Sequence, residues 1–76
     1  MIENRRREKF VSLAERRVTK AIKSLRLIGN LSNKTNYSYA EEDVRKIINA
    51  LDNEIKSLKR RFETDKKSQE VIFRLD

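Results

Sequence analysis

Cysteine, histidine and proline are absent from this 76-residue chain, and glycine occurs once, as Gly29. Without cysteine or histidine, a disulfide and the common zinc sites are excluded, as are the usual nucleophile and general base of enzymes. Neither a P-loop nor a G-x-G-x-x-G motif is present. We therefore expect a protein that is not an enzyme and that uses no metal or cofactor. The lack of proline leaves long stretches free to be helical.

Long apolar runs are missing as well, and none follows the N-terminal residues. We therefore expect neither a secretory signal nor a transmembrane span, which makes the cytoplasm the default location. A single domain of this size encloses little core and usually needs disulfides, a metal or oligomerisation. With the first two excluded, we expect a homo-oligomer, a dimer or higher.

Charge is abundant and uneven. Charged residues make up 41% of the chain, and the formal net charge is +7. Residues 1–28 hold nine basic and three acidic side chains, whereas residues 40–67 hold eight basic and seven acidic ones. Most of the positive excess therefore belongs to the first segment, which favours an anionic partner such as nucleic acid or a phosphorylated nucleotide.

The first segment has the periodicity of an amphipathic helix. Apolar residues recur with the three-and-four spacing of a heptad stripe: Val11, Ala14, Val18, Ala21, Leu25 and Ile28. This spacing predicts a helix from about residue 4 to residue 28. Gly29 is expected to end that helix in the left-handed conformation that glycine adopts readily.

The second segment has a stronger heptad pattern. Its apolar positions also step by four and three: Val44, Ile48, Leu51, Ile55, Leu58 and Phe62. We predict a helix from about residue 39 to residue 64, with Ser38 and Glu41 as a capping box at its start. Acidic residues 41–43 and basic residues 59–61 are then expected near the two ends of the helix dipole that favour their charges.

These elements predict an all-α fold. The two stripes have similar lengths and are separated by a short loop at residues 29–38, which suggests an antiparallel two-helix hairpin. One hairpin buries few side chains, so we expect it to dimerise into a four-helix bundle. Residues 65–76 would form a short C-terminal tail. Residues 71–75 would be a strand or a helical turn that packs on a partner chain or on the open end of the bundle, and the alternative is that the tail is disordered.

A cationic face on the first helix is the leading candidate site. At about 100° per residue, five cations fall within roughly 60° of the helix circumference, opposite the apolar stripe. An arginine run at residues 5–7 adds a basic arm at the helix start. The expected phosphate contacts are Arg5, Arg6, Arg7, Lys9, Arg16, Lys20 and Lys23. A solvated outer face is the alternative. Leu13 and Leu27, on or beside this sector, are either ordinary exposed side chains or a second contact surface.

The loop is the second candidate site. It is rich in asparagine, serine and tyrosine, which either build a polar turn or bind an anion with backbone amides and a lysine. Tyrosines there would stack on a base. The residues of this nucleotide pocket would be Asn30, Ser32, Asn33, Lys34, Asn36, Tyr37 and Tyr39.

The stretch at residues 27–33, with residues 36–39 and the helix start at 42–44, resembles a pattern in short uncharacterised helical proteins of phages and other mobile elements. The resemblance covers residues 10–63 and transfers no functional residue. It implies that the loop is part of a family signature. In size and class, the chain is also similar to small oligomeric phage proteins that sequester cyclic nucleotides, although it matches none of their motifs.

The sequence thus predicts a small basic protein that binds nucleic acid through its first helix. One alternative is an oligomer that sequesters a phosphorylated nucleotide with the loop. Another is a protein-interaction module that docks through Leu13, Leu27 and the tail.

Overall fold

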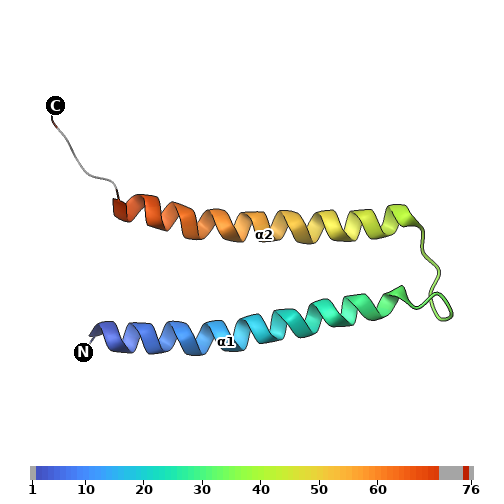
Figure 1. Cartoon of the computed structure of the whole chain (residues 1–76), viewed down its shortest axis with the longest axis horizontal. Helices are drawn as coiled ribbons and strands as arrows, with labels where there is room; N and C mark the ends of the chain where they lie inside the picture. The colour runs from blue at the N-terminus through green and yellow to red at the C-terminus, as the bar shows by residue number, and fades with distance from the viewer. Residues whose placement is uncertain (1, 71–74, 76) are drawn as a thin grey trace. The chain divides into compact units, whose positions relative to one another are not determined.

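The computed structural model describes residues 2–70 and 75, with side chains for residues 3–64 and 75. They form two long helices, α1 and α2, joined by a connection that contains the short 3-10 helix η1 (Figure 1). No strand occurs among the described residues. The predicted all-α class is confirmed, and the order helix, connection, helix is that of a helical hairpin. Residues 1–38 form one unit and residues 39–76 the other.

Helix α1 spans Ile2–Gly29 and begins two residues earlier than predicted. Arginine, lysine, glutamate and leucine fill most of it, and these are good helix formers. Glu3 in the first turn and Arg26 in the last turn carry charges that favour the helix dipole. The arginines at residues 5–7 therefore lie on a regular helix, and successive side chains leave it about 100° apart.

The prediction of a left-handed Gly29 is wrong. Its φ of −58° and ψ of −30° are right-handed helical values, and no described residue has a positive φ. The reason is that the chain does not reverse at Gly29. Helix η1, Asn30–Ser32, continues the right-handed winding with a tighter turn, and the backbone becomes extended only at Asn33.

Helix α2 spans Glu41–Glu70 and begins later than predicted. The capping box of Ser38 and Glu41 is wrong, because Ala40 precedes the first turn and its carbonyl accepts from the amides of Asp43 at 3.0 Å and Val44 at 3.4 Å. The Asp43 carboxylate accepts from the Ala40 amide at 2.8 Å. This is one half of a capping box, shifted by two residues, since alanine has no side-chain oxygen to complete the exchange.

The far end of α2 also differs from the prediction. The helix continues through residues 65–70, which the prediction assigns to the tail. Neither glycine nor proline interrupts this polar stretch, so helix propensity carries it past the last apolar stripe position, Phe62. The cations at 59–61 consequently lie at least nine residues before Glu70 rather than at the helix end. The acidic first turn at residues 41–43 is confirmed. Of the strand or helical turn expected at 71–75, residues 71–74 lie outside the described residues.

None of the side chains that the structure describes is buried, so these residues enclose no core. In the apolar stripe of α1, Val18 is 56% exposed and Leu25 is 44% exposed. In the apolar stripe of α2, Ile55 is 58% exposed and Phe62 is 60% exposed. Each helix thus presents an apolar face that is not yet covered. Apolar faces of this kind are normally buried against another helix.

Candidate nucleic-acid interface

Five cations of α1 share one face of a single, uninterrupted helix. At the period of a regular helix, their side chains leave the axis within a sector of about 60°. All five are exposed. They extend over 18 residue steps, or about 27 Å of helix. We call this surface the α1 basic face, and its members are Arg5, Lys9, Arg16, Lys20 and Lys23.

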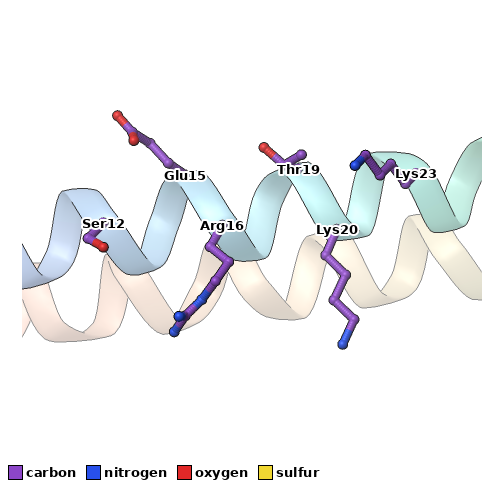
Figure 2. Close-up of a pocket in the computed structure, with 6 residues that line it drawn as sticks. All are labelled: Ser12, Glu15, Arg16, Thr19, Lys20 and Lys23. Atoms are coloured by element: carbon purple, nitrogen blue, oxygen red, sulfur yellow. The ribbon is translucent and has the colours of Figure 1, made fainter.

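The C-terminal half of this face forms a shallow open depression (Figure 2). All the lining residues come from α1, and they are Ser12, Glu15, Arg16, Thr19, Lys20 and Lys23. In Figure 2, Arg16 and Lys20 extend to the same side of the helix, whereas Glu15 extends to the other. The two cations are one helical turn apart, about 6 Å along the axis. The acidic residue of the depression is therefore turned away from this cationic pair.

The cations of the α1 basic face are not neutralised by the described side chains. No ion pair joins any of them to an acidic group in this part of the chain. Ser12 and Thr19 supply hydroxyl groups beside Arg16 and Lys20. Cations with hydroxyl donors next to them suit phosphate oxygens, which accept hydrogen bonds from both.

The three arginines at residues 5–7 leave the helix in different directions. Only Arg5 falls on the α1 basic face, because the next two residues are rotated by about 100° and 200° from it. The Arg7 guanidinium lies 5.8 Å from the centre of the Phe10 ring, a cation–π contact. This contact was not predicted, although the three-residue spacing of an arginine and an aromatic residue on a helix was a usable signal.

The two leucines near the α1 basic face differ in exposure. Leu13 is half-buried, whereas Leu27 is 67% exposed. Leu13 is therefore partly covered already and offers little surface to a partner. Of the pair that the sequence singled out, Leu27 alone is a well-exposed apolar contact in this structure.

The loop has a defined structure of its own. The Asn33 side-chain oxygen accepts from the Thr35 amide at 2.9 Å, and the Asn33 carbonyl accepts from the amides of Asn36 at 3.2 Å and Tyr37 at 3.0 Å. The Asn33 amide itself donates to the Asn30 carbonyl at 3.5 Å. The loop thus has the side chain-to-backbone bonding of a polar turn, which was one of its two interpretations.

The remaining members of the proposed nucleotide pocket differ in exposure. Tyr39 is half-buried and Tyr37 is 48% exposed. Ser32, Lys34 and Tyr39 each already take part in an interaction. Nothing in this geometry favours a nucleotide over a turn that stabilises itself.

Helix α2 carries a smaller cationic group, which the sequence pattern had suggested only as a helix end. Arg60, Arg61 and Thr64 line a shallow depression, together with Ser57. The Arg60 guanidinium donates to the Ser57 hydroxyl at 3.0 Å. This local bond occupies part of one guanidinium, so the group is less available than the α1 basic face.

Two other kinds of site are not found in the described residues. No cluster of three or more metal-ligating side chains occurs among them. None of their helices combines the length and the apolar character that spanning a membrane requires. No protein-family model, curated protein or solved structure matches the chain. Function is therefore inferred from the residues themselves.

Proposed function

We propose that this chain is a small, non-enzymatic nucleic-acid-binding protein that contacts phosphates through the α1 basic face. The observation that carries the proposal is the arrangement of five exposed cations along one side of one helix, without neutralising partners among the described side chains. A charged row of this kind attracts a polyanion rather than a single small anion. Each contact that replaces a condensed counterion adds favourable entropy to binding.

The proposed binding has little sequence specificity. Base recognition in the major groove depends largely on arginine, asparagine and glutamine side chains that pair with base edges. The α1 basic face has no asparagine or glutamine, and three of its five members are lysines. Lysine presents a point charge that suits phosphate better than a base edge. Phosphate contacts fix position on the backbone but carry no sequence information directly.

Self-association belongs to the same proposal. The described residues enclose no core, and a dimer that forms a four-helix bundle would cover the two apolar stripes. The α1 basic face lies opposite the α1 stripe by helical period, so covering that stripe leaves the cations exposed. A cytoplasmic location, where nucleic acid is accessible, is also part of this proposal.

Charge reversal on the α1 basic face tests the proposal. In the variant Arg16→Glu with Lys20→Glu, we expect loss of binding to a mixed-sequence DNA duplex, measured by fluorescence anisotropy at physiological salt. The matched control is Lys46→Glu with Lys56→Glu on α2, where both residues are exposed. The two variants change the net charge of the chain equally. Equal loss of affinity in both would refute a role for this particular face.

The competing functions give different results in the same comparison. A nucleotide-sequestering protein would keep its ligand when Arg16 and Lys20 are reversed and would lose it on substitution of Asn33 and Tyr37. A protein-interaction module would respond most to Leu27→Ala or to removal of residues 68–76. Retained duplex binding in the Arg16 and Lys20 variant would therefore overturn the proposal whichever competitor is correct.

A further inference from the structure

The proposed function includes self-association but does not say which helix of one copy meets which helix of the other. The apolar stripe of α2 answers that question. Its six positions repeat with the alternating spacing of a heptad seam: Val44, Ile48, Leu51, Ile55, Leu58 and Phe62. Ile48 is 49% exposed and Leu58 52% exposed, while Leu51 is half-buried. We call this stripe the α2 seam. It lies on a continuous helix of 30 residues, about 45 Å long.

The residue types of the α2 seam select one kind of coiled coil. In heptad notation, Ile48 and Ile55 occupy position a, and Leu51 and Leu58 occupy position d. β-Branched residues at a with leucine at d favour two parallel strands. The reverse arrangement, or isoleucine at both positions, favours three or four strands. The centre of the seam therefore matches a parallel pair of helices.

The charges beside the seam agree with that orientation. Glu54 is at position g and Lys59 is at position e of the next heptad. In a parallel, in-register pair, position g of one helix faces this position e of the other, so Glu54 of each copy meets Lys59 of its partner copy. Because the pair is symmetric, this contact forms twice.

An antiparallel pair of α2 helices would place like charges together. Residue 53 is the midpoint of the seam, and in such a pair g faces g and e faces e across it. Glu54, at position g, would then meet Glu54 of the other copy. Asp52, at position e, would meet Asp52 of the other copy. Like charges this close are destabilising, so the flanking residues favour the parallel pair.

Helix α1 is less suited to contact its own copy. Its stripe has alanine at residues 14 and 21, where the α2 seam has leucine. Alanine buries little apolar area, and each methylene added to a buried side chain contributes about 0.8 kcal/mol. Residues 1–28 also carry nine basic and only three acidic side chains, so two α1 helices repel one another.

We propose that a second copy of this chain covers the α2 seam, and that the two α2 helices form a parallel two-stranded coiled coil. This inference does not depend on the nucleic-acid proposal, since it uses only the seam and its flanking charges. The seam is shorter than three full heptads, so the two copies bind one another weakly and the dimer dissociates on dilution. It is the contact through which the chain acquires a core.

The first test is oligomeric state, measured for the full chain by sedimentation equilibrium over a concentration series. We expect the wild type to be a dimer and Ile55→Asp to be a monomer. The matched control Asn53→Asp adds the same charge two residues away, at an exposed position outside the seam, and should stay dimeric. A monomeric wild type, or an Ile55→Asp variant that dimerises normally, would overturn the proposal.

The second test exchanges the flanking charges and leaves the seam intact. Glu54→Lys and Lys59→Glu should each weaken self-association by roughly tenfold, because two attractive pairs per dimer become repulsive. The double exchange should restore it. A mixture of the two single variants should form heterodimers in preference to either homodimer. Failure of both the restoration and this preference would refute the contact between Glu54 and Lys59.

The third test determines the orientation of the two helices. Because the chain has no native cysteine, an introduced thiol can form a disulfide only with the same thiol of another copy. Val44→Cys places one thiol at the first seam position. In a parallel dimer the two thiols face each other and oxidise to an intermolecular disulfide. In an antiparallel dimer they lie about 27 Å apart, far beyond disulfide reach. The control Asn49→Cys, exposed and outside the seam, should not cross-link. A Val44→Cys variant that is dimeric but forms no disulfide on oxidation would overturn the parallel arrangement.

Discussion

The salt dependence of nucleic-acid binding gives the sharpest test of the α1 basic face. The logarithm of the binding constant falls with the logarithm of salt concentration by about 0.9 for each phosphate neutralised on B-DNA. Five contacts from one engaged α1 therefore give a slope of about −4.5, and affinity should fall roughly 500-fold between about 50 and about 200 mM salt. Replacing Arg16 and Lys20 by alanine leaves three contacts. The slope should become about −2.7, with a loss of roughly 40-fold over the same range.

The measurement is a fluorescence anisotropy titration of a labelled DNA duplex at several salt concentrations. Alanine has the highest helix propensity, so the variant should keep the helical circular dichroism of the wild type. The control Lys46→Ala with Lys56→Ala removes two exposed cations from α2 and should keep the steeper slope. An unchanged slope in the Arg16 and Lys20 variant would show that these residues do not contact phosphate, whatever the affinity itself does.

Three further predictions concern the local structure. Each is tested by measuring the thermal unfolding of the variant through its helical circular dichroism signal. Gly29→Ala should stabilise the chain by about 1 kcal/mol, because Gly29 is right-handed and an added Cβ meets no atom within 4 Å; a lower melting temperature would contradict its helical conformation. Asp43→Ala should cost about 1 kcal/mol by leaving the Ala40 amide without its acceptor; if the hydrogen bond is what matters, Asp43→Asn should lose less. Asn33→Ala should cost about 1 kcal/mol through the lost bond to the Thr35 amide. Loss of cyclic-nucleotide binding in that last variant, seen by calorimetry against the wild type, would instead favour the loop pocket.

The two helices were predictable because their signals are repeated along the chain. Six apolar positions at heptad spacing define the face of α2. One polar residue among them would not hide the helical period, because the other five positions still show it. The helix ends depend on single residues and were less predictable. A left-handed Gly29 was the natural expectation at a helix end, but glycine permits a left-handed turn without requiring it. At the start of α2, the spacing of Ser38 and Glu41 matches a capping box, but the bond that forms joins the Ala40 amide to the Asp43 carboxylate, two residues further on.

The candidate site was predictable to a similar degree. The direction of five cations follows from helical period alone, so their common face could be deduced before the structure was known. The pairing of Arg7 with Phe10 depends on side-chain torsion angles, which the period does not determine. The bonds made by Asn33 likewise required the backbone geometry of the turn, since the loop composition suited both a polar turn and an anion pocket.

The two proposals together make a prediction that neither makes alone. If the α2 seam joins two copies, each dimer presents two α1 basic faces, and binding of the second face to the same duplex becomes intramolecular. Linked sites of this kind gain about 100-fold to 10,000-fold in affinity when the geometry allows both to engage. With both faces engaged, the wild-type salt slope doubles to about −9. Ile55→Asp should then weaken duplex binding and return the slope to about −4.5, because half of the phosphate contacts are lost although no cation has been removed. The control Asn53→Asp adds the same negative charge and should change neither quantity much. Equal slopes for dimeric wild type and monomeric Ile55→Asp would show that one α1 engages the nucleic acid at a time, and that the dimer serves stability rather than binding.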